Sequence, residues 1–288
     1  MTPFARYIAP ARRSAQLWRV VVVLIVVAVG SVMIIAFLHY PLAQRILQAL
    51  APAEEWEAIT TMMMLTAFWV PVALLIVMVG LLHRRGPGTL FGPDTRQLFR
   101  DFRRVAIALL LLNLVIGFLL PGDEGGMIEP GLAPDRWLVW VLPALIALVV
   151  QVTAEEVVFR GYIQQQMAAR FGTRGAWLVF PSILFAALHV APDKTLLVNV
   201  ETLFLITLMA LAMADLTARA GNLGPALAVH LINNIWAVLL ISDWQDETGL
   251  NGLALFLVLR PEPSLTGTAA AVLMLLIGWL GARLALRR

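Results

Sequence analysis

The chain has no cysteine among its 288 residues. Disulfides, thiolate catalysis and cysteine-ligated metal sites are therefore excluded. Charge is also scarce, because Asp, Glu, Lys and Arg make up only 14% of the residues, whereas 60% are hydrophobic. Soluble domains are usually close to half apolar and a quarter charged. This balance indicates a polytopic membrane protein.

Apolar runs close to the ~20 residues that cross a bilayer recur along the chain. We find no internal repeat, and we treat residues 1–288 as a single integral membrane domain of the all-α class with about eight transmembrane helices. The fourth run is longer than one crossing requires, so we expect its C-terminal end to protrude. The expected spans are roughly 19–38, 62–82, 104–120, 137–165, 176–190, 196–218, 223–241 and 267–286.

The basic residues predict how these spans are oriented. If the N-terminus is cytoplasmic, cytoplasmic segments hold 16 of the 21 basic residues, as the positive-inside rule requires. Both termini are then expected in the cytoplasm. The excess of positive charge is explained by this topology, and we expect no nucleic-acid partner. The sixteen residues are Arg6, Arg12, Arg13, Arg19, Arg84, Arg85, Arg96, Arg100, Arg103, Arg104, Arg170, Arg174, Arg219, Arg283, Arg287 and Arg288.

Span four carries three charged residues in a short stretch: Glu155, Glu156 and Arg160. A charge inside the membrane is costly and usually faces the protein interior or a wet cavity. Glu156 and Arg160 are four residues apart, so they can form an ion pair on one helix face. Adjacent helical residues point about 100° apart, which leaves Glu155 without this partner. Such a carboxylate in apolar surroundings is suited to general acid–base catalysis near neutral pH.

Spans five and seven each carry a polar residue pair with the same spacing. Phe185 and His189 share one face of span five, and His230 and Asn234 share one face of span seven. A lone histidine in a helix is more often structural than catalytic. Together with Glu155, however, these residues give one carboxylate, two imidazoles and one carboxamide on three helices. The motif-bearing core is therefore placed at about 137–241, with its catalytic residues on spans four, five and seven.

The same stretches carry a family resemblance. E-E-V-V-F-R (155–160), F-A-A-L-H (185–189) and H-L-I-N-N (230–234) resemble the EExxxR, FxxxH and HxxxN motifs of the CAAX-processing and bacteriocin-processing (CPBP) intramembrane proteases. The type II CAAX prenyl endopeptidase belongs to this family. The resemblance covers residues 150–240, and it implies an endopeptidase whose partners are the lipid bilayer and a peptide or protein substrate at the membrane.

The resemblance also implies a role for each residue. Glu155 is implied as the general base that activates a water, and His189 as a residue that holds and polarises it. His230 and Asn234 are implied to line the oxyanion site. Structural support is implied for three further residues: Glu156, Arg160 and Phe185.

Two mechanisms remain open at this point. A zinc ion held by Glu155, His189 and His230 has acceptable ligand types and number. The chain lacks the HExxH helix motif, however, and a glutamate-activated water needs no metal. We therefore expect no cofactor, with zinc as the alternative.

Other classes of function also fit some of these residues. A proton-coupled secondary transporter can use buried Glu and His side chains as a proton relay, but the two halves of this chain show no repeat symmetry. A catalytically silent binding scaffold would usually have lost a catalytic residue, and here none of the four is missing. We expect an intramembrane endopeptidase, with the transporter as the alternative.

Overall fold

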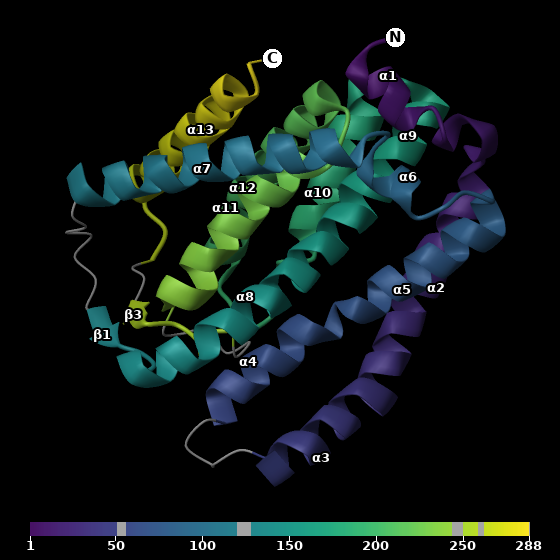
Figure 1. Ribbon diagram of the computed structural model, residues 1–288. Helices are drawn as coiled ribbons and strands as arrows, with labels where there is room; N and C mark the ends of the chain where they lie inside the picture. Colours follow the sequence, from purple (N-terminus) through teal and green to yellow (C-terminus); the bar gives the residue numbers. More distant parts are fainter. Residues whose placement is uncertain (51–55, 120–127, 244–249, 259–261, 288) are drawn as a thin grey trace.

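The computed structural model describes residues 1–50, 56–119, 128–243, 250–258 and 262–287, and these are almost entirely helical (Figure 1). In its first part the chain forms α1 (Pro3–Ile8), η1 (Ala11–Ser14), α2 (Leu17–Ile34), η2 (Ile35–His39), α3 (Tyr40–Leu50), α4 (Trp56–Ala67), α5 (Trp69–Met78), η4 (Val79–His83), α6 (Gly88–Phe91) and α7 (Thr95–Leu119). It continues with β1 (Ile128–Pro130), α8 (Pro134–Glu156), η5 (Val157–Gln164), α9 (Gln165–Phe171), η6 (Gly175–Val179), α10 (Phe180–Ala187), α11 (Leu196–Ala220), α12 (Gly224–Asn234), η7 (Ile235–Leu240), β2 (Ile241–Asp243), β3 (Phe256–Val258) and α13 (Leu265–Leu286).

Several helix ends follow from local sequence. The side chains of Thr195 and Ser264 accept hydrogen bonds from backbone N–H groups in the first turns of α11 and α13, as N-cap residues do. Proline stands in the first turn of α8, α10 and α12, where its missing N–H has no cost. Gly221 ends α11 with φ +71°, a left-handed conformation that favours glycine.

Each of the eight expected spans overlaps a helical rod. Among the described residues, five rods are long and apolar enough to cross a membrane: Leu17–Ile46, Trp56–His83, Pro134–Phe171, Leu196–Ala220 and Leu265–Leu286. Two more, Gly175–Ala187 and Gly224–Leu240, are shorter apolar helices. The remaining rod, α7, is basic in its first half and apolar in its second. The protein is therefore an all-α, polytopic integral membrane protein.

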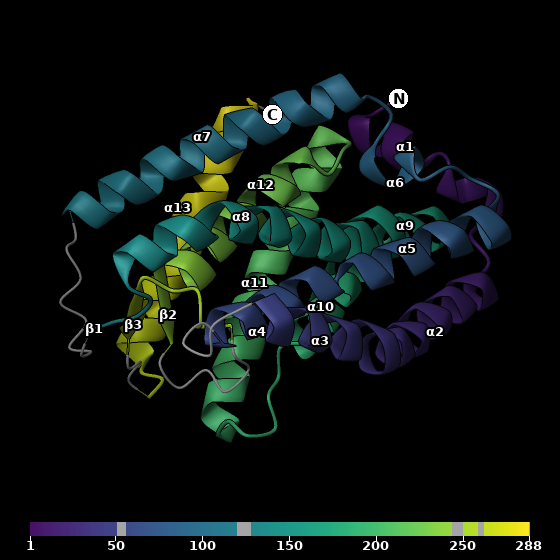
Figure 2. The ribbon, with the colours of Figure 1, turned by 60° about the horizontal axis from the view of Figure 1, so that its bottom comes forward.

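The rod formed by α8, η5 and α9 runs through the middle of the molecule (Figures 1 and 2). α4 and α5 pack along one side of it, and α10 and α12 pack against it from others. α7 lies across α12 and α13. The motif residues of three separate helices are thus brought to the same stretch of the central rod.

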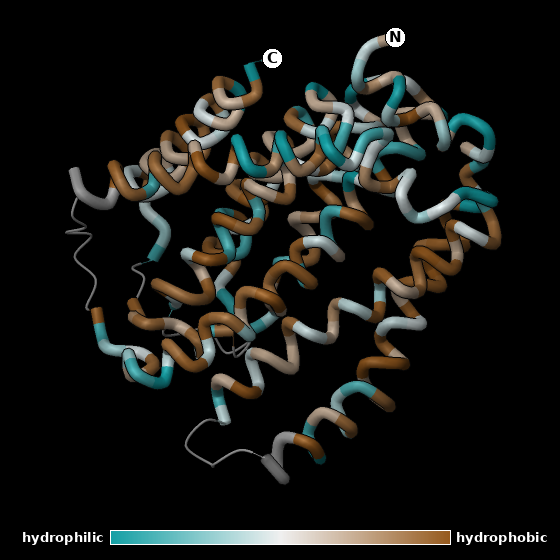
Figure 3. Tube along the Cα trace, in the orientation of Figure 1, coloured by the Kyte–Doolittle hydropathy of each residue, from teal (hydrophilic) through white to brown (hydrophobic). Residues whose placement is uncertain are grey.

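The outer surface of the rods suits a lipid environment. Leu138, Leu142 and Ile146 are spaced four residues apart on α8 and are exposed, as are Val21 and Ile25 on α2. Hydrophilic residues gather instead toward the end of the molecule that holds both termini (Figure 3). Because both termini lie at this end, the chain crosses the molecule an even number of times.

A small sheet was not expected from the sequence. β3 lies between β1 and β2, antiparallel to β1 with Ile128 opposite Val258, and parallel to β2 with Ile241 opposite Phe256. It lies at the end of the molecule opposite the termini (Figure 1). The sheet therefore joins the segment before α8 to the segments that follow α12.

Candidate active site

Two of the three motif helices change their winding directly after the motif residues. α8 ends at Glu156 and continues as the π-helix η5, while α12 ends at Asn234 and continues as the π-helix η7. π-helical turns are rare and are frequently found at functional sites. The helix axis continues through both changes, but the residues after each motif face directions that an uninterrupted α-helix would not give them.

The expected contact between Glu156 and Arg160 is present. Arg160 Nη1 donates to Glu156 Oε1 at 2.8 Å, and both side chains are buried. Arg160 Nη2 also donates to the backbone carbonyl of Ala210 at 3.3 Å, and the guanidinium carbon lies 4.6 Å from the ring centre of Phe185. The arginine therefore connects η5 with α11 and α10 while it neutralises Glu156.

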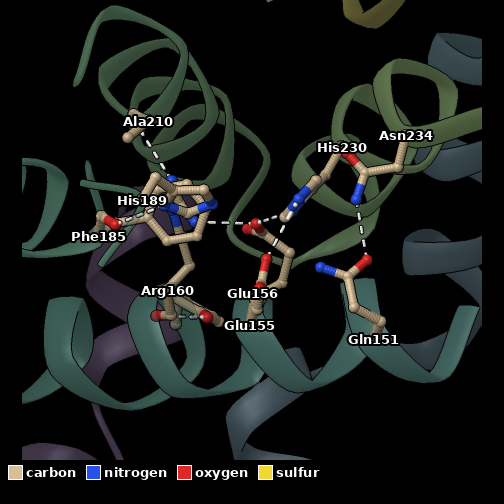
Figure 4. A network of polar contacts seen from close by, with 10 residues as sticks. Gln151, Glu155, Glu156, Arg160, Phe185, His189, Ala210, His230 and Asn234 are labelled. Carbon is tan, nitrogen blue, oxygen red and sulfur yellow. Dashed lines mark hydrogen bonds and ion pairs between the residues drawn. The ribbon is translucent and has the colours of Figure 1, made fainter. Parts of the chain in front are cut away.

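His230 lies between the two glutamates (Figure 4). Its Nδ1 is 2.8 Å from Glu156 Oε1, and its Nε2 is 3.3 Å from Glu155 Oε2. His230 is therefore a close neighbour of Glu155 that the sequence did not predict. Helical spacing within span four could not reveal this contact, because it depends on the packing of α12 against α8.

The two adjacent carboxylates have different surroundings. The Glu156 side chain is 0% exposed, and its Oε1 accepts hydrogen bonds from both Arg160 and His230. The Glu155 side chain is 13% exposed, and its Oε2 is buried without a hydrogen-bond partner in the described part of the chain. Glu156 Oε2 is likewise unpartnered in the described residues, so what distinguishes Glu155 is its partial exposure.

The contact between Glu155 and His230 requires a proton. Since His230 Nδ1 donates to Glu156, a neutral His230 ring has a lone pair on Nε2. A lone pair that faces an ionised carboxylate oxygen at 3.3 Å is repelled. A proton shared between the two atoms would make this contact favourable.

Phe185 packs between the two motif histidines. Its ring centre lies 4.8 Å from that of His189 and 5.8 Å from that of His230. His189 Nδ1 bonds to the backbone carbonyl of Phe185 at 2.9 Å, so Nδ1 carries the proton and Nε2 is the acceptor in the neutral ring. His189 itself is exposed, and no hydrogen bond joins it to Glu155 or His230 in the described residues.

Asn234 does not stand free beside His230. Its Nδ2 donates at 2.8 Å to Oε1 of Gln151, a buried residue of α8 that lies one turn before Glu155. Sequence reasoning missed Gln151, although a glutamine four residues before Glu155 falls on the same helix face. The candidate site therefore contains a second carboxamide.

Two side-chain atoms that could bind a zinc ion lie close together in this site. Glu155 Oε2 and His230 Nε2 are close enough to share one metal ion, but a catalytic zinc site needs three protein ligands. Among the described residues, no group of three His, Asp or Glu side chains is arranged to hold a metal. His189 is exposed, and no hydrogen bond joins it to this pair in the described residues.

The candidate residues lie in a region that matches a known protein family. Residues 136–236 match the family model described as Type II CAAX prenyl endopeptidase Rce1-like. This match supports membership of the CPBP/CAAX protease family. The matched segment begins in α8 and ends in η7, so it contains all the candidate residues. No curated protein and no solved structure matches the chain.

Family membership supports one of the two expected classes of function. A CAAX protease is an intramembrane endopeptidase that acts on peptide substrates at the bilayer, and the transporter alternative is not favoured. The five apolar, membrane-length helices agree with this assignment.

Proposed function

We propose that this protein hydrolyses a peptide bond with a water molecule that Glu155 activates as a general base. The observation that carries the proposal is the state of Glu155 Oε2. This atom is buried, has no hydrogen-bond partner in the described residues, and lies 3.3 Å from His230 Nε2. A water hydrogen-bonded to it would have its oxygen held next to a base.

The proposed hydrolysis needs no reactant other than water and the peptide. The water oxygen forms a bond to the carbonyl carbon, one water proton passes to Glu155, and the carbonyl π electrons become the oxyanion. When the C–N bond breaks, Glu155 returns the proton to the leaving amine. His189 and Asn234 are proposed to assist by polarising the water and by stabilising the oxyanion.

The buried ion pair is proposed to support this chemistry without touching the substrate. Glu156 Oε1 accepts from Arg160 and from His230 Nδ1 at the same time. An acceptor on one ring nitrogen fixes the orientation and tautomer of a histidine, as a carboxylate does in a catalytic triad. Glu156 would therefore direct His230 Nε2 toward Glu155.

The test is cleavage of internally quenched peptides, with free or farnesylated C-terminal cysteine, by the purified full chain in nanodiscs. Glu155→Gln is expected to lower kcat at least ~100-fold with the fold intact, because general-base catalysis contributes about that much or more. Glu57→Gln, an exposed position on α4, is the matched control. Undiminished cleavage by Glu155→Gln contradicts the proposal, as does loss of wild-type activity on treatment with 1,10-phenanthroline.

We also propose that the end with both termini faces the cytoplasm. α1 and α6 lie at this end (Figure 1), and the chain in and just before them is basic, with Arg6, Arg84 and Arg85. Positive charge is retained on the cytoplasmic side. Because the natural chain has no cysteine, single cysteines at positions 13 and 129 can be labelled without background in intact cells. A membrane-impermeant maleimide is expected to label position 129 only.

A further inference from the structure

Gln151 is a buried polar residue that none of the three motifs includes. It lies on α8 one turn before Glu155, and it is only 7% exposed. Its Oε1 accepts from Asn234 Nδ2 at 2.8 Å, whereas its Nε2 makes no hydrogen bond within the described residues. Its two N–H groups are thus free to donate, and Nε2 is not among the fully buried unpaired atoms, so a ligand can reach it.

The direction of this carboxamide is set by its neighbours. Asn233 Nδ2 donates to Asn234 Oδ1 at 3.2 Å, and Asn234 Nδ2 donates in turn to Gln151 Oε1. A carboxamide has one acceptor oxygen and one donor nitrogen on opposite sides. Because the oxygen of Gln151 is held by Asn234, its nitrogen points along α8 toward the two glutamates (Figure 4).

The other motif donors are more heavily used. His230 Nδ1 is bonded to Glu156, and one N–H of Asn234 is bonded to Gln151. Gln151 Nε2 therefore has the most unused hydrogen-bonding capacity among the side chains next to Glu155.

We propose that Gln151 is a further catalytic residue whose Nε2 donates to the carbonyl oxygen of the scissile peptide bond beside Asn234, and that Asn234 also positions Gln151 through the hydrogen bond to its Oε1. This inference rests on the proposed function. The donor is fixed before the reaction and meets the oxygen on which negative charge develops as the water adds. No proton leaves Gln151, because the carboxamide stabilises the oxyanion by hydrogen bonding alone.

The test uses Gln151→Met, which keeps the length of the side chain and removes its N–H groups. With the full chain in nanodiscs and the same quenched peptide, kcat is expected to fall ~10- to 100-fold while KM changes less than about twofold. Asn234→Ala is expected to give a similar loss. The double variant should be no slower than the slower single variant, because the two residues act as one unit.

Gln164→Met is the matched structural control. Gln164 is a fully buried glutamine of the same rod, and its Nε2 donates to the carbonyl of Ala214 at 3.0 Å. This substitution removes one buried hydrogen bond outside the site, so it is expected to lower the unfolding temperature without a selective fall in kcat. Unfolding temperatures of both variants separate a loss of fold from a loss of chemistry.

Two outcomes overturn the inference about Gln151 alone. One is a kcat for Gln151→Met within twofold of wild type when Glu155→Gln is inactive. The other is a fall in kcat that only matches the fall in folded protein, as in Gln164→Met. Full activity of Glu155→Gln would instead overturn the proposed function together with this inference.

Discussion

His230 Nε2 lies 3.3 Å from Glu155 Oε2, so the proposed base and a motif histidine from a different helix share one contact. The pair needs one proton for this contact to be favourable. Glu155 is therefore not expected to act independently of His230.

His230→Gln is expected to lower kcat at least ~100-fold, because the variant loses the group that shares a proton with Glu155. A glutamine can still donate to Glu156, so the fold should be retained. Peptide cleavage between pH 5 and 9 measures the effect. His39→Gln, which alters a histidine bonded to the carbonyl of Met63 outside the site, should stay within about twofold of wild type. Equal activities of the two variants would contradict a role for His230.

Arg160→Met is expected to destabilise the protein by ~3–5 kcal/mol, because it leaves the buried Glu156 without its cationic partner and with only His230 as a donor. Adding Glu156→Gln to this variant removes that charge and should recover part of the loss. Denaturant unfolding of the detergent-solubilised protein measures both. If the single and double variants unfold alike, the ion pair does not account for the stability of this region.

Asn199→Ala is expected to loosen the loop that follows His189. The Asn199 side chain accepts from the Ala191 N–H at 3.0 Å and donates to the Ala191 carbonyl at 2.8 Å, two residues beyond His189. Without these bonds, residues 188–195 should exchange their amide hydrogens faster, and kcat should fall ~5- to 10-fold as His189 loses its fixed position. Hydrogen–deuterium exchange measures the first effect, and unchanged exchange would show that other contacts hold the loop.

Tyr7→Phe is expected to weaken the attachment of α1 to the motif helix. The Tyr7 hydroxyl lies 3.0 Å from the backbone carbonyls of both Arg160 and Leu90. Burial raises the pKa of Tyr7 well above its usual value, so it remains a neutral donor across the physiological range. Losing this donor should cost ~1–1.5 kcal/mol and speed tryptic cleavage after Arg12, with kcat unchanged within about threefold. Wild-type stability and protease resistance would contradict this.

Hydropathy predicted the helical rods because lipid-facing and buried positions are both apolar, so the eight expected ranges all overlap helices. The pairing of Glu156 with Arg160 was also predicted, since it depends on residues four apart on one helix. The contact of His230 with Glu155 was not, because it joins helices whose relative rotation no local pattern specifies. The π-helical turns after Glu156 and Asn234 and the three short strands were not predicted either, because no local sequence pattern specifies them.

The rod that precedes His189 has a consequence for the surrounding lipid. Gly175–Ala187 contains 13 residues, which span about 20 Å at 1.5 Å per residue. The hydrocarbon core of a typical bilayer is ~30 Å thick. Lipid next to this rod must thin to cover it, which brings headgroups and water closer to His189 than membrane depth alone would allow. Bilayers built from longer acyl chains raise the cost of this hydrophobic mismatch, so peptide hydrolysis in vesicles should slow as the acyl chains lengthen.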